Sequence, residues 1–168
     1  ERNTIPSGNS YTSRWKDWTF QNTLNYDFTV ATDHSVNVLL GQSADEHNYY
    51  NIAASATGFP NSLVRTLNVA TTPTQSYTYK DANTTLSYFG RVSYNYKDKY
   101  LLNASIRRDG SSRFGINNKW GTFPSVSAGW KLNEETFMKE FDWLSLLKVR
   151  ASWGMAGNDR IGNYVYMS

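Results

Sequence analysis

The 168-residue sequence contains no cysteine, so it can form neither disulfide bridges nor thiolate-bound metal sites. It has no apolar run approaching the roughly 20 residues of a transmembrane helix. It also lacks a P-loop, a Gly-x-Gly-x-x-Gly fingerprint and the Gly-x-Ser-x-Gly elbow of hydrolases. A net charge of +3 is too small to indicate a nucleic-acid partner. We therefore assign no catalytic, cofactor-binding or metal-binding residue and expect no enzyme.

Tyrosine and tryptophan are abundant, with 12 and 6 copies against 8 phenylalanines. Both side chains carry a polar group on an apolar ring, and they favour interfaces, including the headgroup belt of a membrane.

Residues 86–108 alternate between apolar and polar side chains, which is typical of β-strands, because successive side chains point to opposite faces. The polar residues Asp98 and Lys99 interrupt the pattern and predict a hairpin. Each run is about as long as the roughly 9–11 residues of a strand that crosses a bilayer at a tilt. One face is apolar with tyrosines at its ends, and the other is too polar for a dry core.

Similar alternation predicts further strands at 18–30, 35–44, 126–132 and 147–155, which makes six in total, with Val149 near the middle of the last. Asn133, followed by two glutamates, resembles a helix N-terminus. Phe137, Phe141 and Leu144 continue that pattern at helical spacing, so we expect one short helix near 134–144.

The predicted connections alternate in length. Those at 32–34 and 97–99 are tight, whereas 45–83 and 109–123 are long and polar, the former with a candidate extra hairpin at Leu63–Val69 and Gln75–Lys80. Short periplasmic turns and long extracellular loops are typical of outer-membrane barrels, although the connection at 133–145 is an exception. Six strands cannot close a barrel, which needs about eight. We therefore expect residues 1–168 to be part of a longer protein.

The stretch from Gly90 to Tyr164 resembles one family closely, through five segments in the family's order and spacing: 91–105, 109–115, 123–130, 146–154 and 157–164. They are similar to the β-barrel of SusC/RagA-type TonB-dependent outer-membrane transporters. The resemblance implies an all-β, antiparallel up-and-down barrel of about 22 strands with a plug domain that lies outside these residues. It also implies a place in the outer membrane of a Gram-negative bacterium. Further implications are energy from TonB–ExbB–ExbD, a SusD-like surface lipoprotein, and oligosaccharide or oligopeptide cargo.

Two groups of residues are candidates for contact with cargo or with the lipoprotein lid. Polar side chains expected to face the lumen either contact cargo or bond to the plug and to each other: Arg91, Asn95, Arg107 and Arg150. Aromatic residues of the predicted loops either stack on sugar rings or dock the lid, or they pack within the loops: Tyr49, Tyr50, Phe59 and Trp120. The acidic and histidine triplet Asp45-Glu46-His47 is more typical of a solvated loop than of a metal site.

A soluble β-sandwich that binds carbohydrate on tryptophan and tyrosine platforms is the alternative. The distribution of apolar side chains separates the two, because a barrel wall presents a continuous apolar band with rings at its rims. For a barrel we expect these residues to face lipid: Tyr88, Val92, Leu102, Ile106, Val126, Ala128, Val149 and Ala151. We expect these to face the lumen: Arg91, Asn95, Asn103, Lys131 and Arg150.

Overall fold

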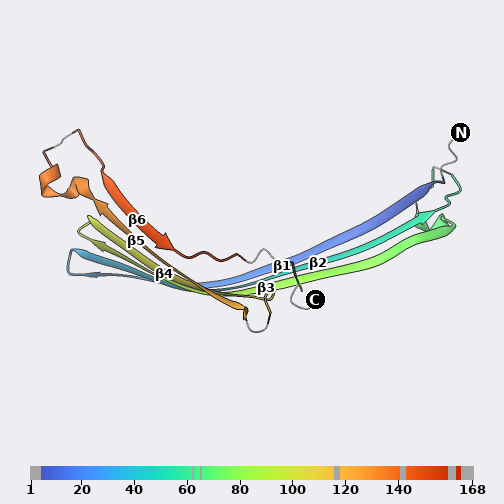
Figure 1. Cartoon of the computed structure of the whole chain (residues 1–168), viewed down its shortest axis with the longest axis horizontal. Coiled ribbons are helices and arrows are strands. Elements are labelled where there is room, and N and C mark those ends of the chain that lie inside the picture. The colour runs from blue at the N-terminus through green and yellow to red at the C-terminus, as the bar shows by residue number, and fades with distance from the viewer. Residues whose placement is uncertain are drawn as a thin grey trace. The chain divides into compact units, whose positions relative to one another are not determined.

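The computed structural model describes residues 5–61, 63–64, 66–115, 118–140, 143–158 and 162–163. This part of the chain forms one six-stranded antiparallel sheet in the order β1-β2-β3-β4-β5-β6 (Figure 1). The strands are β1 (Ser7–Val30), β2 (His34–Thr57), β3 (Thr72–Tyr96), β4 (Tyr100–Ser111), β5 (Trp120–Lys131) and β6 (Lys148–Gly154). In the described residues, no helix is long and apolar enough to span a bilayer. The predicted all-β meander of six strands is confirmed.

The chain divides into two compact units. The first comprises residues 1–18 and 46–83, and the second comprises residues 19–45 and 84–168. In the first unit, the backbone N–H of Gly58 donates to Pro6 over 3.0 Å and that of Thr71 donates to Gly58 over 3.2 Å. Gly58 has a φ of 77°, in the left-handed region that glycine adopts without strain.

The predicted long connection at 45–83 is wrong in extent. β2 continues to Thr57 and β3 begins at Thr72, so the connection is 58–71. The candidate hairpin there is also wrong, because Leu67–Val69 forms a single 3-10 turn, η1, and residues 75–80 lie within β3. The second predicted connection shrinks to 112–119, because β4 ends at Ser111 and β5 starts at Trp120. A polar composition alone therefore does not identify a loop, because the polar residues 45–57 and 72–83 belong to paired strands.

The hairpin predicted from residue 86 onward is confirmed in the pairing of β3 with β4, in which Tyr96 lies opposite Tyr100. Lys97 and Asp98 occupy its turn with φ values of 53° and 55°. Two consecutive left-handed residues are typical of the tight turns whose twist matches a β-hairpin. The Asn95 side-chain amide donates to the Asp98 carboxylate over 2.6 Å and fixes this turn.

The predicted helix near 134–144 is wrong. The chain there makes two 3-10 turns, η3 (Leu132–Glu134) and η4 (Thr136–Met138). Glu135 separates them with an extended backbone, φ −76° and ψ 148°, so that helical hydrogen bonding does not continue. Phe141, one of the residues on which the helix prediction relied, lies outside the described residues.

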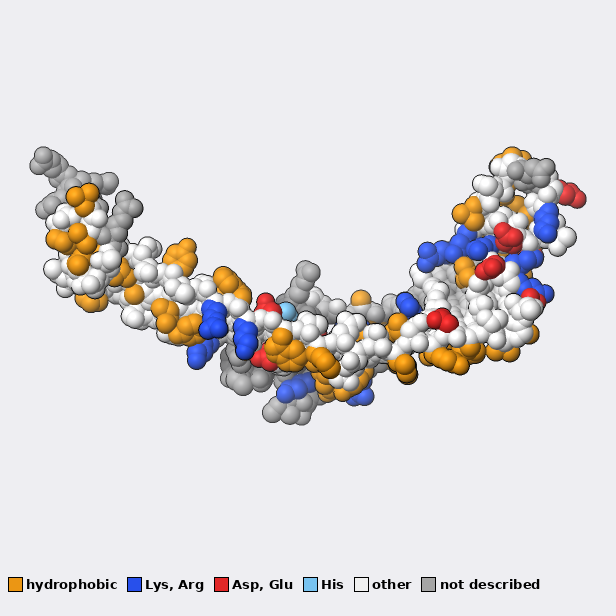
Figure 2. Space-filling view, turned by 180° about the vertical axis from the view of Figure 1, so that it is seen from behind, with side chains coloured by type: hydrophobic (Ala, Val, Ile, Leu, Met, Phe, Trp, Pro, Cys, Tyr) orange, Lys and Arg blue, Asp and Glu red, His pale blue; other side chains and the backbone are white. Residues whose placement is uncertain are grey.

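The register of β3–β6 gives the second unit two chemically different faces. The apolar face carries the whole set expected to face lipid, because Val92, Ala104, Val126 and Trp153 are successive cross-strand partners, as are Tyr94, Leu102, Ala128 and Ala151. The polar face carries Arg91, Asn95, Asn103, Lys131 and Arg150 together. In Figure 2, hydrophobic side chains gather on one side of this part of the sheet and lysine and arginine on the other.

The apolar face is exposed. Ile106 is 54% exposed, Val149 52% and Trp153 60%. Among the described residues, Ala56 is the one buried apolar side chain. A soluble domain instead hides its large apolar residues in a core. The sheet's apolar face therefore needs an apolar partner outside these residues.

Candidate functional site: the polar face of the second unit

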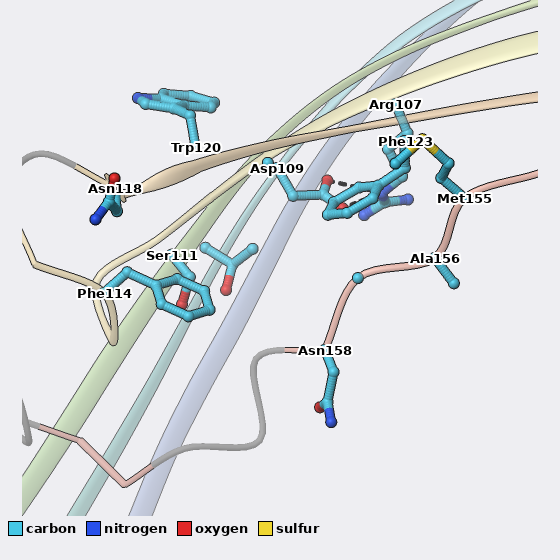
Figure 3. A pocket seen from close by; sticks show the side chains of 13 residues that line it. Arg107, Asp109, Ser111, Phe114, Asn118, Trp120, Phe123, Met155, Ala156 and Asn158 are labelled. Atoms are coloured by element: carbon cyan, nitrogen blue, oxygen red, sulfur yellow. Dashed lines mark hydrogen bonds and ion pairs between the residues drawn. The ribbon is translucent and has the colours of Figure 1, made fainter.

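Among the described residues, the hollows on the polar face of the second unit include two larger ones. The larger, of about 670 Å³, lies where β4 ends and β5 begins and is shown in Figure 3; Arg107, Asp109 and Phe123 are among the residues that line it. The smaller, of about 540 Å³, lies among the middle parts of the strands, and its lining includes Arg91, Asn103, Ser127, Arg150 and Ser152. The lining of the larger hollow is mostly apolar, whereas that of the smaller one is about equally polar and apolar.

Arg107 is the central cation of the larger hollow. Its Nε donates to both carboxylate oxygens of Asp109, over 2.7 and 2.9 Å. Its Nη2 donates over 3.0 Å to the hydroxyl of Ser87, which is fully buried. The guanidinium lies 5.6 Å from the centroid of the Phe89 ring. These contacts engage two different nitrogens of the planar guanidinium with two partners, and so hold it in one orientation.

Glycines allow aromatic rings to lie directly on the strands around the larger hollow. A Cβ on Gly157 would overlap the ring of Phe123, and one on Gly121 would lie 2.5 Å from it. On the opposite, apolar face, a Cβ on Gly110 would lie 3.0 Å from three atoms of the Trp120 indole. The close approach of backbone and ring requires glycine at these positions. Phe123 thereby closes one wall of the hollow.

The charged groups of the larger hollow are committed to partners within the protein. Asp109, the carboxylate in the larger hollow, is already paired with Arg107. The described residues also contain no group of three or more histidine, aspartate or glutamate side chains able to hold a metal ion. The polar groups and the ring of Phe123 are those that polar ligands use for hydrogen bonding and stacking.

The predicted contact residues separate into distinct places. Arg107 lines the larger hollow, and Arg91 and Arg150 line the smaller one. Trp120 borders the larger hollow, but it belongs to β5 rather than to a loop, and its indole lies on the apolar face against Tyr88. Asn95 lies beside the β3–β4 turn, where its Oδ1 is buried and makes no hydrogen bond within the described residues.

The other three candidates lie in the first unit. The Tyr49 ring lies 5.2 Å from Trp15 and 6.0 Å from Tyr79, centroid to centroid. The Lys80 ammonium lies 5.6 Å from the Tyr50 ring, and Phe59 packs where Gly8 lacks a side chain. Tyr49 and Tyr50 belong to β2 rather than to a loop. All three rings have partners in their own unit, and their role toward cargo or lid stays a prediction.

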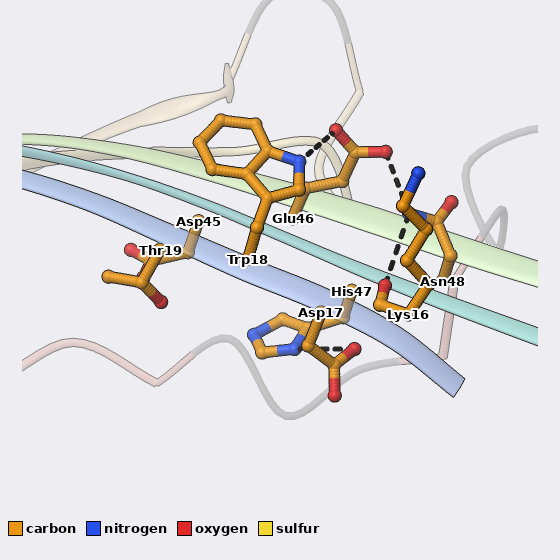
Figure 4. Close-up of polar contacts among 8 residues, drawn as sticks. All are labelled: Lys16, Asp17, Trp18, Thr19, Asp45, Glu46, His47 and Asn48. Atoms are coloured by element: carbon orange, nitrogen blue, oxygen red, sulfur yellow. Dashed lines mark hydrogen bonds and ion pairs between the residues drawn. The ribbon is translucent and has the colours of Figure 1, made fainter.

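The triplet Asp45-Glu46-His47 lies in β2 and forms no metal site. Each side chain pairs with a residue of β1 instead (Figure 4). Asp45 accepts from Thr19 over 2.8 Å, Glu46 accepts from the Trp18 indole over 2.9 Å, and His47 Nδ1 lies 3.3 Å from Asp17. Because neighbouring residues of a strand point to opposite faces, three consecutive side chains cannot converge on one ion.

A carboxylate cluster that sequence reasoning missed joins the 132–147 connection to the strand ends. Glu135 accepts hydrogen bonds from the Tyr100 hydroxyl over 2.6 Å and from the Trp130 indole over 3.1 Å. It also pairs with the Lys99 ammonium at 3.2 Å. The signal in the sequence was an acid a few residues after a strand-terminal tryptophan, but it was interpreted as a helix N-terminus.

The Glu135 cluster predicts a pH-dependent contact. The hydrogen bonds from Tyr100 and Trp130, followed by the interaction with Lys99, lower the pKa of Glu135 below its ordinary value of 4.5. A lowered folded-state pKa gives a stabilisation that is full above about pH 4.5 and is lost as the pH falls through the lowered pKa. Fluorine NMR of fluorotryptophan at position 130 should therefore titrate below pH 4.5. Glu135→Gln should abolish that titration, and Glu134→Gln should leave it unchanged; a shift that survives Glu135→Gln would contradict the assignment.

The family comparisons agree with this geometry. A family model described as "TonB dependent receptor-like, beta-barrel" matches residues 2–166. The chain belongs to this family. It is 41% identical over 160 residues to the TonB-dependent receptor P39 of Formosa agariphila, covering 94% of this chain and 15% of that protein. It is 49% identical over 85 residues to the TonB-dependent receptor SusC of Bacteroides thetaiotaomicron, covering 51% of this chain and 8% of SusC.

A comparison with a solved structure supports the same family. A chain of the RagAB peptide transporter superimposes with a TM-score of 0.88 at 30% identity, over 93% of this chain and 18% of that chain. The chain is therefore part of a SusC/RagA-type barrel, as the sequence resemblance implied. It spans between 8% and 15% of the length of the curated relatives that it matches. Membership of the family removes the soluble sandwich as an interpretation of the fold.

Proposed function

We propose that this chain forms part of the wall of a TonB-dependent importer in the outer membrane of a Gram-negative bacterium. The apolar face of β3–β6 contacts lipid, and the polar face lines the lumen. The observation that carries the proposal is the register, which places exposed apolar residues on one face and arginines, serines and asparagines on the other. That division is typical of a transmembrane barrel.

Two rows of aromatic residues support a membrane-spanning band. In one row, Tyr100 stacks between Tyr96 and Trp130, with centroids 6.1 and 6.2 Å away. In the other row, Tyr88 stacks on Trp120 at 6.2 Å. Trp120 and Trp130 lie ten residues apart on β5. At about 3.4 Å per residue and a tilt of about 40°, that spacing corresponds to a height of about 26 Å, close to the apolar band of about 25 Å in outer-membrane barrels.

The connections suggest which end faces the cell exterior. The turns at 31–33 and 97–99 and the 132–147 connection share one end of the second unit, because Lys97 N–H donates to Asp33 and Lys131 N–H donates to Lys99, both over 2.8 Å. We assign this end to the periplasm, since two of its three connections are tight turns. The 132–147 connection is held against it by the Glu135 cluster. Connections 58–71 and 112–119 are then extracellular.

We further propose that the complete transporter carries oligosaccharides or oligopeptides, docks a SusD-like surface lipoprotein, and receives energy from TonB–ExbB–ExbD through a plug. Support comes from the names of the similar proteins, SusC and the RagAB peptide transporter. The two hollows of the polar face supply donors, acceptors and a ring for contact with cargo or plug. In this proposal the segment has no enzymatic role.

Cysteine labelling tests which face meets water. In the full-length transporter in native membranes, Ser105→Cys and Ser127→Cys should react with a water-soluble maleimide, whereas Val92→Cys and Val126→Cys should be protected by lipid. Ser105 and Val92 are matched by position, because they belong to neighbouring strands in the middle of the sheet. Rapid labelling of Val92→Cys with protection of Ser105→Cys would reverse the two faces.

An epitope inserted at Asn68 tests the topology. Asn68 lies in η1 within the 58–71 connection, so the tag should bind antibody on intact cells. A tag at Asp98, in the turn at the opposite strand end, should bind only after the outer membrane is permeabilised. Detection of the Asp98 tag alone on intact cells would invert the assignment.

A further inference from the structure

Arg108 is the one charged side chain on the apolar face among the paired residues of β3–β6. The register places it on that face, directly opposite Tyr88 on β3 and Thr122 on β5. It is exposed, and no carboxylate of the described residues pairs with it. Its neighbour Arg107 points to the polar face and is bonded to Asp109. A lone cation on an apolar face is costly unless it lies at the rim and finds an anion there.

The surroundings hold the Arg108 guanidinium in place without using its donors. Its Cζ lies 5.3 Å from the centroid of the Trp120 indole. The indole lies flat on Gly110 and stacks against Tyr88 at an interplanar angle of 24°. Stacking on a ring face leaves the guanidinium N–H groups in the guanidinium plane free to bind an oxyanion. The Thr122 hydroxyl is exposed beside them.

The other aromatic row has no equivalent free cation in the described residues. There, Lys99 pairs with Glu135 at 3.2 Å, and Lys97 lies 3.5 Å from Asp33 and stacks on Tyr96. Of the two aromatic rows, only the row of Tyr88 and Trp120, next to the 112–119 connection, therefore carries an unpaired cation within the described residues. In the proposed topology, that row lies at the level of the outer-leaflet headgroups.

We propose that Arg108, on its Trp120 and Tyr88 platform, binds a phosphate group of an outer-leaflet lipid. The proposal rests on the proposed membrane orientation and adds a lipid ligand to it. A phosphate fits because it presents several oxygens to the planar fork of arginine and carries the charge that Arg108 lacks. The acyl chains of the same lipid would then lie along the exposed Ile106 and Val126.

Native mass spectrometry of the full-length transporter with bis-phosphorylated lipid A tests the proposal. Arg108→Gln should weaken binding about tenfold, because it removes a charge-assisted contact worth about that factor. Arg108→Lys should keep part of the affinity, because it retains the charge without the fork. Arg91→Gln, on the opposite face, should bind as the unmodified protein does. Dephosphorylated lipid A should bind weakly to all four proteins.

The controls separate the failure modes. Equal binding of bis-phosphorylated lipid A by Arg108→Gln and the unmodified protein would overturn the lipid site. Competition by millimolar inorganic phosphate as effectively as by lipid would mean a general anion site and would also overturn it. Quenching of the fluorescence of Trp120 and Trp130 by brominated lipid reports separately on whether the apolar face of the sheet meets the bilayer. If Arg108→Gln does not weaken lipid A binding but the tryptophans are still quenched, only the lipid site is refuted. If the tryptophans are not quenched, the proposed membrane orientation is refuted.

Discussion

Val126→Arg is expected to lower the free energy of unfolding of the assembled barrel by about 2–4 kcal/mol. Val126 lies opposite Ala104 and Trp153 on the apolar face. It stands about midway along β5 between Trp120 and Trp130, where a lipid-facing charge is furthest from both interfaces. A denaturant titration of the refolded full-length protein in phospholipid bilayers measures the change.

Two matched variants make this prediction specific. Ser127→Arg places the same side chain one residue further along β5 but on the polar face, so its cost should be well below that of Val126→Arg. Val149→Arg lies on the apolar face but opposite Trp130, at the rim, and its cost should be only about 0–1 kcal/mol. Equal losses for Val126→Arg and Ser127→Arg would indicate a protein core rather than lipid at Val126.

Gly41→Val is expected to destabilise the barrel by about 1–3 kcal/mol, the usual cost of overpacking a close contact. A Cβ at this position of β2 would overlap the ring of Phe89 on β3. Phe89 in turn lies beneath Arg107, which is bonded to Asp109. Displacing the ring therefore disturbs the wall of the larger hollow as well as the sheet.

A double-mutant cycle with Phe89→Ala checks the mechanism. If the cost of Gly41→Val comes from the ring, it should be much smaller when Phe89 is already alanine, giving a coupling energy of about 1 kcal/mol or more. Gly90→Val serves as the control, because a Cβ there would lie 3.4 Å from a methyl carbon of Leu40, which is ordinary van der Waals contact. Additive losses in the cycle would mean that Gly41 is required for another reason.

The sequence predicted the sheet best where one face is apolar. Between Leu86 and Ile106, alternation identified both strands, the turn between them and the face of each strand residue, because one apolar and one polar face impose a strict period of two. Residues 45–57 and 72–83 are strands with polar side chains on both sides, so no periodicity marked them. Their many polar residues predict a loop instead.

The candidate site was predictable in part. The sequence singles out Arg107, which lines the larger hollow, and Trp120, whose indole lies instead on the apolar face. The contribution of Phe123, Gly121 and Gly157 depends on which backbone lies beneath the ring, and sequence spacing carries no such information. The helix prediction failed at Glu135 because its carboxylate bonds to Tyr100 and Trp130, contacts between segments that local propensity ignores. Val149, expected near mid-strand, lies at the rim because β6 begins at Lys148.

The exposed apolar face differs from a protein core in what replaces a lost side chain. Truncating a core residue leaves a cavity that rigid neighbours fill only partly, and the cavity adds to the loss of transfer free energy. Acyl chains are fluid and would close over Ile106→Ala without a void. Only the transfer term, about 0.8 kcal/mol per methylene, would then remain. In the proposed orientation, a lipid-facing residue must be hydrophobic, but side chains of different shapes can replace one another there. Phe89 and Phe123 on the other face fit closely over glycines, so their shape matters as well.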